Sequence, residues 1–568
     1  MAFRHGVYTS EVPTSLLPAV SVDSNVVFAV GTAAIETLDD GSTKYINKPR
    51  CYYSYDEFVT EMGWNADRFS DYSLQELIYS HFALYRGAPV VAVNVFDPAK
   101  HQTQVSKTAV FEGGRLDLGH EFVMDVKISV GSSVVRTETQ EVTAVTLTNG
   151  VVTLPHQNIS EVEITLNEGE TLLVEGQDYA VNLATGTVTR LANSQIPTAS
   201  STIYITYDYR VIVHTDDVKV EGIDYELNAR TGIATRLAGG SLGEDAQVTV
   251  SFAYADVSKV TAADIIGGID ADGNSLGLEL IDSVFPLYRL VPGSILCPKY
   301  GEDPAVAVTM AAKSHDINGL FNAIAIVDIP SDGTSGGLTK YTEVPAYKQN
   351  NNLVDEHLIV CWPKVKLGDN VYGLATHLTG LMSQTDNANG GVPYGSASNK
   401  GLNVTSIGLV DTDGSWKELS LGMEKVNYLN GEGIYSALNW TGGLRSWGGR
   451  MSCYPGNTDP KDCQEPIRRM FNWYRNTFIL TYFQKVDAPM TKRLIQTILR
   501  SENIRLEGFT SREILLGGRI TFDESKNPLT DLIDGIVRFH LYFTPPPAAR
   551  EIDCTFEFDT DNLATLFS

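Results

Sequence analysis

The sequence predicts a multidomain α/β protein: a discontinuous α/β core, an inserted all-β region of duplicated small β modules, an α+β C-terminal domain, and extended terminal arms. Short, wholly apolar runs alternate with helical patterns before residue 100 and again after residue 258, which is typical of a parallel sheet. The stretch between them is rich in Val and Thr and contains an internal repeat. The expected parts are an N-terminal arm (1–25), core segments (26–100 and 258–455), inserted β modules (101–257), a C-terminal domain (456–543), and a proline linker with a final strand (544–568).

The first core segment follows a strand–helix–strand order. The apolar runs VVFAVG at 26–31 and VVAVNVF at 90–96 predict strands that are buried on both faces. SLQELIYSHFALYRG lies between them and predicts a helix, with Ser73 and Glu76 as a capping box and Gly87 as its end. Strand, helix and strand in this order predict a parallel α/β sheet.

The inserted region contains a clear repeat. VEGQDYAVNLATGTVTRLA begins at Val174 and VEGIDYELNARTGIATRLA begins at Val220, so matched residues lie 46 positions apart. Each copy predicts a strand, a tight turn at Thr-Gly, a second strand and an alternating third strand, over 174–209 and 220–256. We therefore expect duplicated β modules that interrupt the α/β domain.

The α/β rhythm resumes after Val260. Thr261 and Asp264 are suited to cap a short helix, and the segment at 275–288 is amphipathic. The further strands are expected at GSILCP, AIAIVDI, HLIVCWP and GRITFD. The further helices are expected at PAVAVTMAAKSH, NVYGLATHLTGLMSQ, PIRRMFNWYRNTFILTYF and TKRLIQTILRSEN.

Composition and charge argue against several classes of function. The 568 residues are 43% hydrophobic and 20% charged, which is a globular composition. A formal net charge of −26 argues against a direct grip on a nucleic-acid backbone. The N-terminus shows no signal-peptide pattern and no long apolar window occurs, so we expect neither secretion nor membrane insertion. The cysteines are expected to be buried free thiols made in a reducing cytoplasm: Cys51, Cys297, Cys361, Cys453, Cys463 and Cys554.

No motif predicts a catalytic residue, a metal site or a cofactor. Asp270, Asp272 and Asn274 alternate like the start of a calcium loop, but the loop's required glycine and bidentate glutamate are missing. We expect a polar turn there, and another at 411–416. Ser335 lies in GTSGG, but a flexible stretch separates it from the preceding strand, unlike the serine of a nucleophile elbow.

Two basic stretches interrupt the acidic background. IRRMFNWYR contains Arg468, Arg469 and Arg475, next to aromatic residues. A second stretch, TKRLIQTILRSENIR, follows at 491–505. A nucleic-acid site is one interpretation. An amphipathic helix with a solvated basic edge is the favoured one, and a basic helix that faces an acidic protein partner is the third.

The chain ends with a strand pattern on each side of a proline run. Apolar residues alternate at 537–543, and they alternate again at 552–558. The TPPPAA between them favours a stiff, extended connector and supplies few amide donors. The final strand therefore either folds back through residues 544–551 as a hairpin or joins the sheet of another subunit.

Several of these segments occur in a familiar order. HGVYTSEVP precedes VVFAVGTA, and then follow GGIDADGNSLGLELIDSVFPLYRLVPGSILCP, AIAIVDIP and YFTPPPAAREIDCTFEFD. In this order they resemble the contractile tail sheath proteins of bacteriophages and phage-tail-like bacteriocins. The resemblance covers both ends and the α/β middle, whereas the inserted β modules have no fixed counterpart in that family.

The resemblance implies a structural polymer and not an enzyme. Sheath subunits stack as rings, by resemblance hexameric, around an inner tail tube protein, with baseplate and tail terminator proteins as further partners. When triggered, the sheath shortens and drives the tube through a host envelope, which serves genome ejection in a virus. The implied location is the virion tail, with synthesis in the host cytoplasm.

The resemblance also assigns roles to residues. Terminal arms of such sheaths add strands to the sheets of neighbouring subunits, and the C-terminal region lies next to the tube. The implied N-arm residues are Phe3, Val7, Tyr8 and Val12. The implied donated C-terminal strand contains Ile552, Cys554, Phe556 and Phe558, and its hinge linker is Pro545, Pro546 and Pro547. The candidate tube contacts are Lys492, Arg493, Arg500 and Arg505.

Two other classes of function remain open from the sequence. The repeated β units suit an adhesin or receptor-binding protein of a virion surface. A hydrolase that uses Ser335 is the third class. Within the sheath interpretation, the β modules are expected to project outward and decorate the particle.

Overall fold

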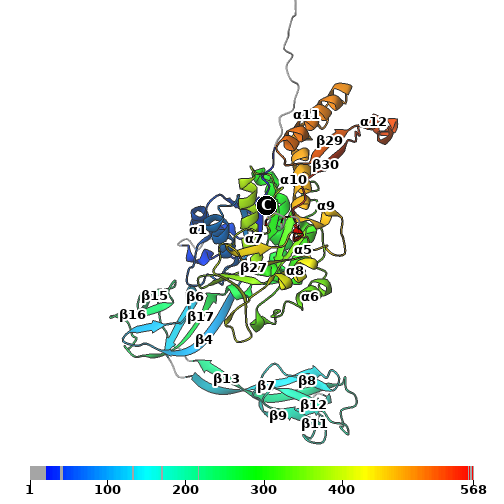
Figure 1. Ribbon diagram of the computed structural model, residues 1–568. Coiled ribbons are helices and arrows are strands. Elements are labelled where there is room, and N and C mark those ends of the chain that lie inside the picture. Colours follow the sequence, from blue (N-terminus) through cyan, green and yellow to red (C-terminus); the bar gives the residue numbers. More distant parts are fainter. Residues whose placement is uncertain are drawn as a thin grey trace, which may run out of the picture. The chain divides into compact units, whose positions relative to one another are not determined.

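The protein is a mixed α/β chain with several sheets, as the sequence predicts (Figure 1). The computed structural model describes residues 21–38, 43–130, 133–167, 170–214, 217–560, 562 and 566. The chain divides into two compact units, one of residues 1–102 with 256–568 and one of residues 103–255. The candidate N-arm residues Phe3, Val7, Tyr8 and Val12 lie outside the described residues.

An eight-stranded sheet organises the first unit. Its central six strands are parallel, whereas the two edge strands β2 and β28 are antiparallel to their neighbours. The inner strands are mostly apolar because helices and loops bury both faces. In spatial order the strands are β2 (Arg50–Tyr52), β3 (Val90–Asn94), β1 (Val27–Gly31), β20 (Ser294–Leu296), β21 (Ile324–Asp328), β22 (Leu358–Cys361), β27 (Ile434–Trp440) and β28 (Gly443–Trp447).

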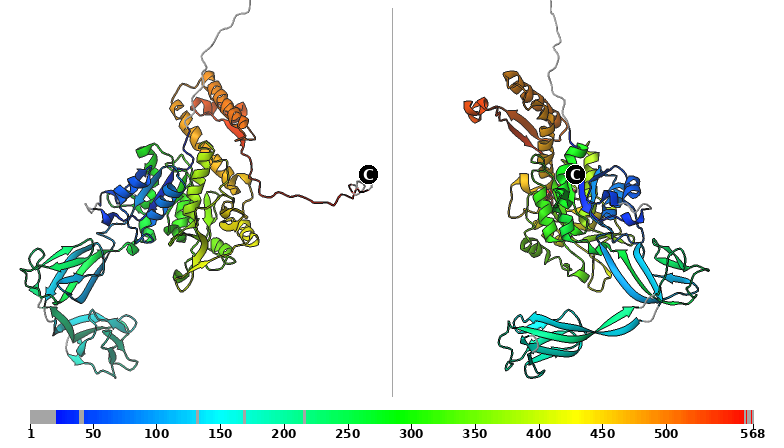
Figure 2. Two further views of the ribbon diagram at one scale, coloured as in Figure 1. Left: turned by 60° about the vertical axis from the view of Figure 1, so that its left-hand side comes forward. Right: turned by 180° about the vertical axis from the view of Figure 1, so that it is seen from behind.

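Helices pack against the strands of this sheet and continue into the C-terminal region (Figure 2). None of those in the described residues is long and apolar enough to cross a membrane. Their bounds are α1 Tyr55–Met62, α2 Ser73–Ile78, α3 Ala262–Ile266, α4 Val284–Tyr288, α5 Pro304–Lys313, α6 Val344–Asn350, α7 Leu374–Ala388, α8 Met423–Gly431, α9 Pro460–Cys463, α10 Glu465–Tyr482, α11 Lys492–Ser511 and α12 Leu529–Ile533. The first unit also has small sheets of β18 (Gly268–Ile269) with β19 (Ser275–Leu276), and of β24 (Asn370–Tyr372), β23 (Lys364–Leu367), β25 (Ser406–Val410) and β26 (Trp416–Glu418).

Local capping was predicted correctly at one helix and wrongly at another. Thr261 and Asp264 form the capping box of α3. At α2 the N-cap is Tyr72, and the Ser73 hydroxyl accepts instead from the Thr32 N–H (3.0 Å). The Glu76 carboxylate accepts from the Gly373 N–H (2.6 Å) at the start of α7. A buried carboxylate at the amino end of a distant helix satisfies that helix's unpaired N–H groups, so a tertiary contact replaces the local box.

The second unit contains two β modules of the same design. In one, β15 (Tyr225–Asn228) pairs with β16 (Ile233–Arg236), which pairs with β5 (Arg115–Asp117). In the other, β11 (Tyr179–Asn182) pairs with β12 (Thr187–Arg190), which pairs with β8 (Val151–Thr153). Each module adds a four-stranded sheet. The first has β14 (Asp217–Val218), β6 (Val123–Val130), β17 (Gln247–Ala255) and β4 (Gln102–Val110). The second has β10 (Thr171–Leu172), β9 (Ser160–Leu166), β13 (Thr202–His214) and β7 (Ser133–Thr146).

The repeat itself covers only part of each module. The core of the module that contains Tyr225 also includes Phe111 and Ile128, which precede both copies of the repeat. The core that contains Tyr179 is built from residues 147–207. One module is therefore inserted into the other in sequence, between β6 and β14.

Repeated side chains explain why the two copies look alike. Asp178 accepts from the Val174 N–H, and Asp224 accepts from the Val220 N–H, each at 2.9 Å. The Thr-Gly turns contain Gly186 and Gly232, which have φ of 65° and 64°, a conformation that favours glycine. These residues shape loops, so their repetition is explained by their part in folding the two modules.

Candidate assembly site at the arm roots and the C-terminal sheet

The C-terminal region contains a two-stranded antiparallel sheet. β29 (Gly517–Thr521) pairs with β30 (His540–Thr544) from Gly517 opposite Thr544 to Thr521 opposite His540. One face of this sheet packs against α10 and α11, where Tyr482, Ile498 and Ile520 form a small buried core. The loop between the two strands carries α12 (Figures 1 and 2).

The two edges of this sheet differ. The Asn503 side chain on α11 accepts a hydrogen bond from the Ile520 N–H (3.1 Å) and donates one to the Ile520 carbonyl (3.4 Å). In an antiparallel pair every second residue turns both backbone groups away from the partner strand, so Asn503 occupies the outer edge of β29. Leu541 lies opposite Ile520, and its backbone groups therefore face the outer edge of β30. No strand of the described residues pairs with that edge.

The segment after β30 does not fold back as a hairpin. Pro545 is buried, but residues 546–559 have neither helix nor strand and most are exposed (Figure 2). Ile552, Phe556 and Phe558 are 88%, 93% and 77% exposed. Large apolar side chains spaced in alternation and left in water mark a surface that is normally covered by a partner.

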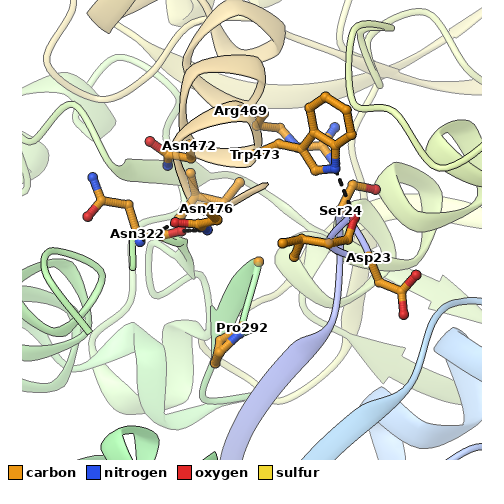
Figure 3. Close-up of a pocket in the computed structure, with 11 residues that line it drawn as sticks. Asp23, Ser24, Pro292, Asn322, Arg469, Asn472, Trp473 and Asn476 are labelled. Carbon is orange, nitrogen blue, oxygen red and sulfur yellow. Dashed lines mark hydrogen bonds between the residues drawn. The ribbon is translucent and has the colours of Figure 1, made fainter. Parts of the chain in front are cut away.

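Residues 22–25, which lie just before β1 and are called here the N-arm root, are contacted by side chains of α10. The Trp473 indole N–H donates to the Val22 carbonyl (2.9 Å), and the Val22 N–H donates to the Thr477 hydroxyl (3.5 Å). On the same helix Asn476 exchanges two hydrogen bonds with the Asn322 backbone, of 3.0 and 2.8 Å. The cavity that these residues line is only about 10 Å³, enough for one water molecule (Figure 3). The contact between residues 22–25 and α10 is therefore closely packed, and its cavity is too small for a ligand larger than water.

A buried ion cluster lies beside the N-arm root. Arg469 of α10 pairs with Asp386 and, at 3.2 Å, with Glu465, and the three side chains are 4%, 1% and 0% exposed. The Ser24 hydroxyl donates to Asp386 (2.8 Å). Burial raises the pKa of both carboxyls, and Arg469 opposes that rise. Burial opposes the charge of Arg469, but its two carboxylate partners raise its pKa.

The basic residues of α11 divide into two groups. Lys492, Arg493 and Arg500 are exposed. Arg505 pairs with the buried Glu502 of the same helix (3.1 Å). Glu502 also accepts hydrogen bonds from the hydroxyl of Tyr482 (2.7 Å). Three of the four candidate tube contacts are thus presented to the surface, whereas Arg505 stabilises the packing of α11 on α10.

The two motifs that the sequence offered for chemistry form surface loops. Ser335 is exposed, and its hydroxyl donates to the Asp332 carbonyl (3.2 Å). Asp270 accepts from the backbone N–H groups of Asp272 (2.9 Å) and Asn274 (2.8 Å), which closes the expected polar turn. Within the described ranges, no three His, Cys, Asp or Glu side chains form a group that could hold a metal ion.

Two predictions about side-chain exposure are wrong. The favoured solvated edge of the first basic stretch does not include Arg468 or Arg469, whose side chains are 11% and 4% exposed. Arg468 pairs with Asp462 of α9 (3.2 Å), and Arg469 pairs with Asp386 of α7, a distant partner that the sequence does not signal. The cysteines are all free, but Cys554 is exposed and Cys51 is half-buried, whereas the sequence suggested that all were buried.

The residues that hold the arm roots were missed by sequence reasoning. Trp473 and Thr477 fit the ordinary pattern of an amphipathic helix, and Asn503 is one polar residue among many on α11. Nothing near them in the chain indicates a backbone partner at Val22 or Ile520. An isolated polar residue on the apolar side of a helix is the one available signal, and it does not name its partner.

Comparison with known proteins gives a consistent group of relatives. No protein-family model matches the chain. The tail sheath protein of Burkholderia phage BcepMu is 26% identical over 582 aligned positions, which span 99% of this chain and 98% of that protein. A putative prophage major tail sheath protein of Pseudomonas aeruginosa (strain UCBPP-PA14) is 22% identical over 312 positions, 53% of this chain and 74% of that protein. The solved helical sheath of the anti-feeding prophage, in its contracted state, is 11% identical with a TM-score of 0.49, covering 98% of this chain and 99% of that chain.

The fold and the site define a class of protein with an α/β body, an inserted β unit and an incomplete C-terminal sheet. Similarity to the BcepMu protein extends over nearly the full length of both chains. Over this length the chain is similar to tail sheath proteins.

Proposed function

We propose that this chain is the structural subunit of a contractile tail sheath, which polymerises helically around an inner tube and contracts to drive the tube through a host cell envelope. The observation that carries the proposal is the unpaired apolar segment at 552–558, together with the open edge of β30 in the same chain. Full-length similarity to a phage tail sheath protein supports it. The subunit is placed in a virion tail or a tail-like particle and is synthesised in the host cytoplasm.

The proposed joint adds the C-terminal strand of one subunit to β30 of another. Each backbone hydrogen bond gained contributes roughly 0.5–1.5 kcal/mol. Burial of Ile552, Phe556 and Phe558 adds about 1.5–3 kcal/mol each, from which the ordering of the segment must be subtracted. The outer edge of β29 is less available for pairing with the same strand, because Asn503 already binds the outward N–H and carbonyl of Ile520.

The prolines supply a pivot between the strand and the body. Pro545 is buried, Pro546 is half-buried and Pro547 is exposed. A stiff connector without amide donors keeps the donated strand apart from its own β30. Subunits can then rotate relative to one another while the exchanged strands stay paired.

The proposed mechanism needs no enzyme, cofactor or nucleotide. Contraction is the relaxation of a metastable extended packing to a better-buried one. The partners are other copies of the chain in stacked, hexameric rings, the tube protein, and the baseplate and tail terminator proteins. Lys492, Arg493 and Arg500 of α11 are the proposed tube contacts, and the N-terminal arm is the second exchanged strand. Neither nucleic acid nor membrane is a direct partner.

Deletion of residues 551–568 tests the proposed strand exchange. Full-length protein should form long helical tubes by electron microscopy, and the truncated chain should remain as small particles. Identical tubes from both chains would refute the exchange. An adhesin, the alternative function, would form small oligomers in both cases.

Cross-linking tests the choice of edge. Thr555→Cys is combined either with Tyr542→Cys on β30 or with Arg519→Cys on β29, its opposite residue. A short bismaleimide should give a covalent ladder only with the β30 pair, and Thr555→Cys alone measures the background from Cys554. A ladder only with the β29 pair would place the donated strand on the other edge.

A further inference from the structure

Both terminal arms are fastened to the same turn of α10. On one side, Trp473 binds the Val22 carbonyl through its indole N–H (2.9 Å), at the root of the N-terminal arm. On the other side, the Phe543 ring lies 4.3 Å from the Phe471 ring and 4.9 Å from the Tyr474 ring, between ring centroids. Phe543 is two residues before Pro545, where the C-terminal arm begins.

Phe509 of α11 connects the two fastenings. Its ring makes edge contacts with Trp473 (5.8 Å between centroids) and with Tyr474 (6.4 Å). Trp473 and Phe509 are buried. The Tyr474 hydroxyl donates to the buried Glu502 (2.5 Å), which fixes α11 against the same turn. A continuous set of aromatic contacts thus extends from the first described residues of the chain to its last strand.

The turn is also fixed to the α/β body. The Asn472 side chain donates to the Ala323 carbonyl (3.1 Å) just before β21. Asn476 binds both backbone groups of Asn322 (3.0 and 2.8 Å). Arg469, one turn earlier, is locked to Asp386 of α7 and to Glu465. A force on either arm therefore meets a helix that cannot slide without breaking several buried polar contacts.

We propose that the turn of α10 from Phe471 to Tyr474, together with Phe509, is the junction that transmits force between the two arms of one subunit. A pull on the N-terminal arm reaches this helix at Val22, before the chain enters β1, and crosses the helix to the C-terminal arm. The junction rests on the proposed function, because it transmits force only where neighbouring subunits hold the arms. In a helical polymer the junction joins one exchanged strand to the next, so that tension passes from arm to arm through this helix.

Single-molecule force measurement on the full-length chain tests the junction. Handles are attached at the two ends of the chain, and the lifetime of the first rupture is measured at constant force. Trp473→Phe keeps an aromatic ring but removes the hydrogen bond to Val22, and Phe543→Leu removes the ring contacts on the other side. Each should shorten the first-rupture lifetime, by about tenfold for a lost buried hydrogen bond. Trp362→Phe, a fully buried tryptophan in the α/β body, is the matched control and should leave that lifetime unchanged.

The outcomes separate the junction from the wider proposal. Unchanged lifetimes in both junction variants, or equal shortening in Trp362→Phe, would overturn the junction. Circular dichroism of each variant checks that the fold is intact, and Tyr474→Phe, which keeps the ring and loses the bond to Glu502, provides a milder second variant. Electron microscopy of the same preparations tests the sheath function by itself, since wild-type chains that form no tubes would refute that function and leave the force result standing.

Discussion

Replacement of Arg469 by alanine should strongly destabilise the first unit, with a pH dependence of known sign. The substitution leaves Asp386 and Glu465 as buried carboxyls without their cation, at 1% and 0% exposure. Breaking a buried pair by removing one partner costs about 3–5 kcal/mol. Asp386 keeps its hydrogen bond from Ser24 (2.8 Å), so we expect about 4 kcal/mol at pH 8.

The pH dependence follows from the raised pKa of both carboxyls. A carboxyl whose pKa is higher in the folded protein binds a proton on folding, so it lowers stability as pH rises above its ordinary pKa near 4. Without Arg469 the pKa of both carboxyls rises further. The deficit of the variant relative to wild type should therefore shrink between pH 8 and pH 5, by at least about 1.4 kcal/mol, the value of one pH unit for one carboxyl.

Urea-induced unfolding of both proteins at the two pH values, followed by circular dichroism, measures the difference. Comparison with wild type at each pH cancels the effect of the many surface carboxylates. Arg475→Ala is the control on the same helix, because its pair with Asp316 is solvent-exposed (46% and 68%) and should contribute at most about 1 kcal/mol. A deficit below about 1 kcal/mol, or one that is equal at pH 5 and pH 8, would refute the account of this cluster.

Two further predictions concern folding in each unit. Gly380→Ala in α7 should cost about 1–3 kcal/mol, because the added Cβ would lie 2.5 Å from Cδ2 of the buried Tyr85. The same urea assay measures this cost. Gly508→Ala in α11, where the added carbon meets nothing within 4 Å, is the control and should not destabilise the protein. In the second unit, backbone N–H groups of Val220 and Ser241 lower the pKa of Asp224 to about 2. Its stabilising effect should be complete above its ordinary pKa near 4 and lost as pH falls toward 2. An NMR titration in which Asp224 titrates near 4 would contradict this structure of the loop.

Much of the α/β body was predictable because the signal is local. VVFAVG is wholly apolar and VVAVNVF is apolar except for Asn94, as expected of strands that are buried on both faces. Thr261 and Asp264 cap α3 because the two residues are three positions apart, within reach of one turn. The same reasoning failed for Ser73 and Glu76, which have the same spacing, since the amino end of α7 competes for the carboxylate across 297 positions of sequence.

The sequence by itself determined the α/β rhythm, the interruption by repeated β units, and the alternating apolar face at 552–558. Each depends on the periodicity of neighbouring residues, which a linear pattern records. Only the tertiary structure decided that this final segment does not return to β30, that Asn503 closes one edge of the sheet, and that Trp473 and Phe543 bring both arm roots to one turn of α10. Those contacts join residues tens to hundreds of positions apart, and which polar group finds which partner is settled by packing, where an unpaired buried donor or acceptor costs about 1–3 kcal/mol.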